Sequence, residues 1–352
     1  MNETVNNKKQ NFISWFAMMW KTHPLFSTSV ALVVMVILQT LALGFNFPTF
    51  GAWFTIWLNN WVNILRNNAA IGIIALGMTF VIISGGIDLA VGSTLVAVGA
   101  VVMMLIDGSG HGVLASMGIT GAPAFLIAII IGIVFGAILG EFTGALVTNG
   151  KLPPFIATLG TMKIWRSVTQ QYMQGNTPTV PGGFLKIASF EIGGQMLMPV
   201  IYWILLTVLL YVVSKRTAFG RHVVAIGSNE RAAKLSGINV RRVKRRVYAL
   251  MSLLVALSAV LQVARIGSMD YANAGSGYEM DAIAAAIVGG TNMSGGKGSV
   301  VGTVLGMLII AVMNNLLNLM GVPPFLREAC KGIIVIGAVL LQKKESNRQP
   351  LN

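Results

Sequence analysis

Few of the side chains that carry chemistry in enzymes occur at a useful spacing in this chain. Cys330 is the only cysteine, and His23, His111 and His222 lie far apart, with no paired carboxylates or thiols beside them. A metal site needs several such ligands at short spacings, and a nucleophilic triad needs a base oriented beside its nucleophile. We therefore expect no catalytic residue, no metal and no cofactor, and a protein that is not itself an enzyme.

One glycine-rich stretch has some features of a phosphate-binding loop. Residues 294–299 read Ser-Gly-Gly-Lys-Gly-Ser. The loop pattern requires glycine at position 291 and serine or threonine after the lysine, whereas this chain has Thr291 and Gly298 there. We infer no nucleotide site, so any ATP would have to be handled by another chain.

A second glycine-rich pattern occurs twice. Residues 85–92 read Gly-Gly-x-Asp-Leu-Ala-x-Gly, and residues 289–296 read Gly-Gly-x-Asn-Met-Ser-x-Gly. Glycine lets the backbone leave helical geometry, and paired broken helices in the two halves of a chain are typical of a transporter's substrate path. Two plain turns between helices explain the repeat equally well. The candidate pathway or gate residues are Gly85, Gly86, Asp88, Gly289, Gly290 and Asn292.

Asp88 is the only acid in the first of these two blocks. An ionisable residue within a membrane segment is a functional candidate by default. Aspartate is also a favoured helix N-cap, and a helix is expected to start near Leu89. We favour the cap for Asp88 and keep a gating role as second.

The composition indicates what must position these residues. The chain has 352 residues, of which 55% are hydrophobic and only 10% are charged, against about 25% charged in soluble domains. Lipid must therefore be the solvent over most of the surface. The net charge of +14 could suggest nucleic acid, but ten basic residues and one acid crowd into 215–246. A basic loop between apolar segments is typical of the cytoplasmic face of a membrane protein.

The long apolar runs predict an all-α polytopic membrane protein of about ten transmembrane helices, since about 20 residues cross the hydrocarbon core. Basic residues near both ends of the chain predict cytoplasmic termini and hence an even number of spans. The aromatic-rich stretch 45–66 suits a membrane interface better than a span. The predicted spans are 26–45, 68–84, 89–106, 123–147, 155–171, 196–214, 247–264, 282–296, 299–318 and 325–341.

Two spans have unusual features. The segment 155–171 carries Lys163 and Arg166, so it is either buried in the bundle or short enough for its basic residues to reach the outer interface. The segment 123–147 carries Gly132, Gly136, Gly140 and Gly144 on one helix face, which favours close helix packing. Glu141 lies beside that ladder and is expected near the cytoplasmic end.

The basic loop contains a short predicted helix. Asn229 or Ser228 can cap it, Glu230 suits its first turn, and Gly237 can end it. Ala232, Ala233 and Leu235 give it a small apolar face that fits a groove in a partner protein. On pattern alone, a solvated connecting helix is the stronger interpretation.

The motifs of the chain favour the partner-binding helix over the solvated connecting helix. Glu230, Ala232, Ala233 and Gly237 match the coupling motif of ABC importer permeases. The chain resembles the ribose/galactose/xylose permease family in stretches 84–93, 152–162, 217–221, 277–285 and 289–298, which run in family order. The resemblance implies a permease subunit that alternates access for a monosaccharide. It also implies a second permease subunit, as homodimer or heterodimer, an ABC ATPase, and an extracytoplasmic sugar-binding protein.

The resulting expectation is a bacterial inner-membrane protein. Its layout is a cytoplasmic tail (1–25), one transmembrane permease domain (26–341) with a cytoplasmic coupling loop (215–246), and a second cytoplasmic tail (342–352). Ribose is the first guess for the sugar, because 314–321 is most similar to that branch. The alternative is a stand-alone secondary transporter or channel for a small polar solute, which predicts more carboxylates within the membrane. A membrane-embedded enzyme would need a nucleophile or metal set that is not found.

Overall fold

The computed structural model describes residues 19, 24–45 and 47–346, without the side chains of 24, 335, 338, 339 and 341–346. Most of the predicted N-terminal tail and residues 347–352 of the C-terminal tail therefore lie outside the described residues. The described part is all helical, apart from one isolated bridge between Ile192 and Gln195. Its helices are α2 (Pro24–Leu43), α3 (Phe50–Ile83), α4 (Val91–Ile106), α5 (Val113–Ser116), α6 (Gly121–Thr148), α7 (Pro154–Met173), α8 (Gly182–Ser189), α9 (Met198–Arg216), α10 (Ala218–Ser228), α11 (Glu230–Leu235), α12 (Val240–Ile266), α13 (Tyr278–Val288), α14 (Val300–Leu319) and α15 (Pro324–Ser346).

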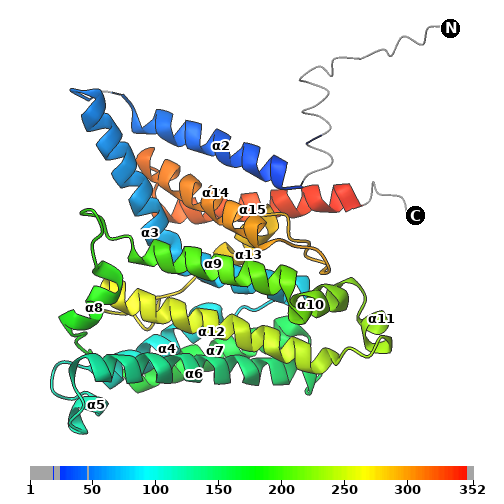
Figure 1. The fold of residues 1–352 in the computed structure, drawn as a ribbon, viewed down its shortest axis with the longest axis horizontal. Coiled ribbons are helices and arrows are strands. Elements are labelled where there is room, and N and C mark those ends of the chain that lie inside the picture. Colours follow the sequence, from blue (N-terminus) through cyan, green and yellow to red (C-terminus); the bar gives the residue numbers. More distant parts are fainter. Residues whose placement is uncertain (1–18, 20–23, 46, 347–352) are drawn as a thin grey trace.

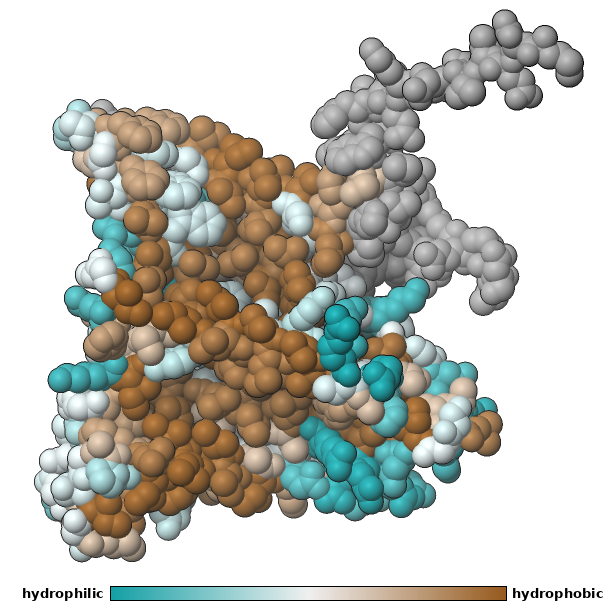
Figure 2. Space-filling view, in the orientation of Figure 1, coloured by the Kyte–Doolittle hydropathy of each residue, from teal (hydrophilic) through white to brown (hydrophobic). Residues whose placement is uncertain are grey.

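The long helices form one bundle with a buried centre and an apolar outside. Most of the apolar parts of α3 and α12 are buried, whereas α2, α6 and α9 leave most of theirs exposed. Apolar residues form a broad band across the surface, and hydrophilic residues gather at its ends, most densely at the end that holds α10, α11 and the start of α12 (Figure 2). Exposed apolar helices whose ends are polar are suited to a bilayer. The structure thus confirms the predicted all-α polytopic membrane protein.

Figure 1 shows that the start of α2, the end of α15 and the pair α10–α11 lie at one end of the bundle. Six of the described helices are long and apolar enough to cross a membrane, namely α2, α3, α6, α9, α12 and α14, and α4 is a shorter apolar helix. Each of the ten predicted spans contains a helix, but α7, α13 and α15 do not meet those criteria, so the number of ten crossings is not confirmed.

The aromatic-rich stretch and the second predicted span are one helix. α3 runs 34 residues from Phe50 to Ile83, and Thr49 caps it by accepting a hydrogen bond from the amide of Ala52. The stretch contains no proline after position 48, so nothing stops the helix between its aromatic half and its apolar half. Its aromatic rings stack at helical spacing, as in the pair Trp53 and Trp57.

The predicted span 282–296 is wrong in extent. α13 ends at Val288, Gly289 forms its C-cap, and Gly290 has a φ of 87°. The helix has 11 residues, about half of what a crossing needs. Residues 267–277 before it are not helical, so this part of the chain is a half-helix preceded by an irregular segment. Irregular backbone at membrane depth is tolerated where protein surrounds it.

The glycine ladder acts as the spacing predicted. Gly132, Gly136, Gly140 and Gly144 are all buried on α6. A methyl group on Gly140 would lie 2.5 Å from the Tyr248 carbonyl oxygen, and one on Gly136 would lie 2.6 Å from the Ala256 side chain. Gly136, Gly140 and Gly144 therefore let α6 approach α12 closely, while Gly132 faces Val102 of α4.

Candidate functional site

The short helix predicted in the basic loop is present as α11. The side chain of Asn229 accepts a hydrogen bond from the Ala232 amide at 3.0 Å, so Asn229 rather than Ser228 is the N-cap. Glu230 lies in the first turn, where it pairs with Lys244 of α12 at 2.7 Å. This pair ties the start of α11 to α12, and the rest of the short helix is exposed apart from Ala233.

The end of α11 also agrees with the sequence. Gly237 has a φ of 83°, and the Ile238 amide donates to the Ala233 carbonyl, which is the pattern of a glycine-terminated helix. The predicted apolar face divides in two. Ala233 is buried against the protein, whereas Ala232 is exposed and Leu235 is 89% exposed. Leu235 therefore projects from a helix whose other exposed residues include the basic Arg231 and Lys234.

Both glycine blocks end a helix in the same way. After α3, the amides of Gly85 and Gly86 donate to the carbonyls of Ile82 and Val81. After α13, the amides of Gly290 and Thr291 donate to the carbonyls of Ile287 and Ala286. Because Gly85 and Gly290 are the two left-handed residues, the structural repeat is shifted by one residue from the sequence repeat. Asn292 lies in the second turn, where it accepts from the Ser294 amide.

Asp88 has a role close to the predicted one, but α4 starts later than expected. Its carboxylate accepts from the Ala90 amide at 2.9 Å, and the side chain is 2% exposed. The N-cap of α4 is Ala90, without a side-chain hydrogen bond. Asp88 therefore closes a turn just before α4 and does not cap the helix. The residues after Gly86 form this turn, so α4 begins only at Val91.

The two glycine turns meet at the end of α10. The Gly296 amide donates to the Ile83 carbonyl at 2.9 Å. Gly227 lies against both of them, since a methyl group on it would overlap the Ile83 carbonyl oxygen and lie 2.5 Å from the Gly296 nitrogen. We call Ile83, Gly227 and Gly296 the glycine junction. The junction connects the end of α10 to the two glycine turns that follow α3 and α13. α10 ends at Ser228, and α11 begins two residues later at Glu230.

A second group of polar residues surrounds the irregular segment 267–277. Arg166 of α7 donates to the backbone carbonyls of Tyr271 and Ala274, at 3.2 and 2.8 Å. A methyl group on Gly92 of α4 would overlap the carbonyl oxygen of Gly275. The segment 155–171 is thus not buried as a whole, because Lys163 and most of α7 are exposed, whereas Arg166 is half-buried and holds the irregular backbone in place.

Three further charges follow that segment. Asp281 of α13 is 6% exposed and pairs with Lys331 of α15 at 3.0 Å, and Lys331 also pairs with Glu328 at 2.9 Å. The sequence analysis did not single out Asp281 or Lys331. The available signal was an ionisable residue inside each of two apolar runs, which in membrane segments usually marks a paired and functional group.

Lipid-exposed helices around irregular polar segments, with a basic helix pair at one end, define a multi-pass membrane transport protein. The chain belongs to the family described as the branched-chain amino acid transport system permease component, whose model matches residues 60–339. The resemblance drawn from the motifs is thereby confirmed, and the chain is a transport permease rather than an enzyme.

Curated relatives cover most of the chain. A ribose import permease of Bacillus subtilis (strain 168) is 44% identical over 82% of this chain and 85% of its own length. A probable ABC transporter permease of Escherichia coli (strain K12) is 38% identical over 88% of both chains. The xylose transport system permease of the same strain is 32% identical over 90% and 92%. No solved structure matches the chain significantly.

Proposed function

We propose that this chain is the membrane permease subunit of an ATP-driven importer of ribose or a closely similar monosaccharide. The observation that carries the proposal is the glycine junction, because it connects an outward-pointing helix to both broken regions of the bundle. The names of the relatives supply the substrate class and the transporter type. The layout remains a tail (1–25), a permease domain (26–341) and a tail (342–352), with both tails in the cytoplasm.

In this account, α11 is the coupling helix. Leu235 and Ala232 enter a groove of an ABC ATPase that hydrolyses ATP in the cytoplasm, while Ala233 and the Glu230–Lys244 pair fix α11 to the permease. When the ATPase changes state, it displaces α11 and with it the end of α10. A partner that binds one arrangement better shifts the balance between the two arrangements.

The glycine junction passes this displacement into the bundle. Gly227 moves against Ile83 and Gly296, and this movement shifts the two glycine turns, which act as gates. The turn after α3 contains Gly85, Gly86 and Asp88. The turn after α13 contains Gly289, Gly290 and Asn292. The irregular segment 267–277, held by Arg166, lines the sugar path beside α4. Its backbone carbonyls and nearby side chains supply the hydrogen-bonding groups that a sugar requires.

The other components follow from the same proposal. An extracytoplasmic binding protein delivers the sugar, a second permease subunit completes the pathway, and the complex lies in the bacterial inner membrane. Co-reconstitution tests this. Labelled ribose should enter proteoliposomes only when this chain, its ATPase, the binding protein and ATP are all present. Uptake by this chain alone would support a stand-alone transporter instead.

A stand-alone ion-coupled transporter is less consistent with the charges. Such a protein needs a membrane carboxylate that is free to exchange ions or protons. Asp281 is held by Lys331, Asp88 accepts a hydrogen bond from the Ala90 amide, and no relative reported above carries a name that describes ion-coupled transport.

A further inference from the structure

A cavity lined mainly by arginine opens where the end of α6 meets the start of α12. Its volume is about 540 Å³. The proposed coupling mechanism does not use it. Its lining residues are Glu141 and Asn149 of the α6 end, and Asn239, Arg241, Arg242, Arg245 and Arg246 of the α12 start. Four arginines against one glutamate give the lining a net charge of +3.

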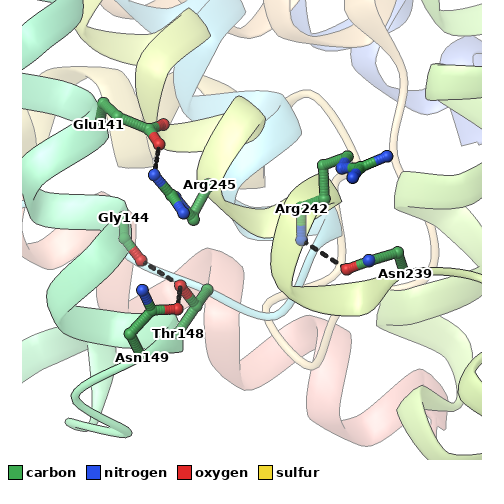
Figure 3. A network of polar contacts seen from close by, with 7 residues as sticks. All are labelled: Glu141, Gly144, Thr148, Asn149, Asn239, Arg242 and Arg245. Atoms are coloured by element: carbon green, nitrogen blue, oxygen red, sulfur yellow. Dashed lines mark hydrogen bonds and ion pairs between the residues drawn. The ribbon is translucent and has the colours of Figure 1, made fainter.

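Only one of the four arginines has a partner of opposite charge in the described part of the chain. Arg245 pairs with Glu141, as Figure 3 shows, and its buried Nε has no hydrogen-bond partner there. No ion pair among the described residues involves Arg241, Arg242 or Arg246. The first turn of α12 contains no acid, so the positive end of the helix dipole adds to the same field. The cavity is thus built for an anion that the chain does not supply.

The place of the cavity identifies the anion. The α6 surface that leads up to it is apolar and exposed, with Val134, Ile138 and Phe142 at helical spacing. A phospholipid whose acyl chains lie along this surface would have its headgroup at Glu141 and the arginines. Basic pockets between transmembrane helices at the cytoplasmic side recognise anionic headgroups, and arginine binds phosphate oxygens in bidentate fashion.

The cavity is separate from the ion pair that ties α11 to α12. Arg245 lies on the α12 face that packs on α6, where a methyl group on Gly144 would lie 3.0 Å from the Arg245 Cα. Lys244 lies on another face of α12 and pairs with Glu230 of α11. We propose that the arginine cavity binds the phosphate headgroup of an anionic phospholipid.

The test measures binding of dioleoyl phosphatidylglycerol to the purified full-length chain by native mass spectrometry in neutral detergent. Each surface arginine contributes about 1 kcal/mol toward anionic lipid, so the double variant Arg241→Gln, Arg242→Gln should bind about 30-fold more weakly. The matched control is Lys215→Gln with Arg216→Gln, which removes two charges at the end of α9, outside the cavity. It should stay within about threefold of the parent chain, because salt screens distant charges.

A gain of binding separates the site from a folding defect. Glu141→Gln frees Arg245 from its ion pair, and we expect about fivefold tighter binding of phosphatidylglycerol from the one added charge. Phosphatidylcholine should show no such response in any variant. A misfolded chain cannot produce this increase.

Three results would overturn the proposal. Equal losses in both double variants would mean a diffuse surface field and no site. Competition by inorganic phosphate at the lipid's own concentration would identify a soluble anion as the ligand. Unchanged lipid binding with lost retention of the ATPase in the Arg241→Gln, Arg242→Gln chain would assign the arginines to the partner protein.

Discussion

Replacing Gly227 with alanine tests the glycine junction at its narrowest point. The added methyl group would lie 2.9 Å from the Ile83 carbonyl carbon and 2.5 Å from the Gly296 nitrogen. Carbon atoms in contact are normally separated by about 3.5–4.0 Å, so the end of α10 must move by roughly 1 Å. Overpacking costs about 1–3 kcal/mol, and losing the Gly296–Ile83 hydrogen bond adds about 1 kcal/mol.

That cost is local, so we expect a defect in coupling and not in assembly. α11 keeps its cap and its Lys244 pair, and the ATPase should still bind. Coupling energies of about 1–3 kcal/mol correspond to roughly 5–150-fold, so ribose uptake by the complete transporter should fall at least about fivefold. The assay compares labelled ribose uptake with ATP hydrolysis in the same proteoliposomes.

The matched control is Gly160→Ala. Gly160 lies in α7, and a methyl group there meets nothing within 4 Å, so uptake should be unchanged. If Gly227→Ala transports ribose at the parental rate while the complex assembles normally, the junction does not carry the coupling. Uptake and ATPase retention lost together would assign Gly227 to assembly, which also contradicts the reasoning.

Three further outcomes are expected. Glu230→Gln removes an ion pair whose glutamate is 56% exposed, so it should change the melting temperature little. It should nevertheless lower the amount of sugar taken up per ATP hydrolysed. Unchanged uptake would mean that Glu230 has no role in coupling. Lys331→Met leaves Asp281 buried without its cation and should destabilise the chain by about 3–5 kcal/mol in thermal unfolding. Adding Asp281→Asn should restore most of the lost stability. Equal instability of the single and the double variant would contradict a paired role. Asp107 lies in the loop after α4, and burial opposes its ionisation, but hydrogen bonds from Ser109 and Thr179 hold its pKa below the ordinary value. A depressed folded-state pKa contributes stability above the unfolded-state pKa. The protection factors of the Ser109 and Thr179 amides, which compare their exchange rates with those of an unstructured peptide at the same pH, should therefore be high at neutral pH and fall only in acid, while Asp107→Asn should show low protection throughout.

Local signals predicted α11 well. A cap residue at Asn229, an acid at Glu230 and a glycine at 237 act within a few residues of one another, so they can be read without knowing the fold. The glycine ladder of α6 was predicted for the same reason, since a four-residue spacing needs only one helix. Neither the capping residues of α11 nor the glycine spacing of α6 identifies the helix against which the element packs. Only the structure shows that the ladder contacts α12.

Long-range contacts could not be predicted in this way. Ile83, Gly227 and Gly296 are separated by more than sixty residues in the chain, and only the packing of α3, α10 and the loop before α14 brings them together. Arg166 was recognised as out of place in an apolar segment, but its partners are backbone carbonyls, which have no sequence signature.

The error at α13 has a physical cause. The run from Ala282 to Val288 is apolar enough to start a span, and the expectation of about 20 residues extended it past Gly289 and Gly290. Those glycines were already recognised as breaks. A half-helix is stable here because α3, α14 and α15 pack against it and residues 281–287 are buried.

The orientation of α11 can be measured directly with one cysteine. Leu235→Cys in a chain that also carries Cys330→Ser places a single thiol at the exposed tip of α11. A membrane-impermeant maleimide should leave it unmodified in intact cells, modify it in inside-out vesicles, and be blocked when the ATPase is bound. Modification from outside intact cells would place α11 on the wrong side of the membrane for any contact with an ATPase.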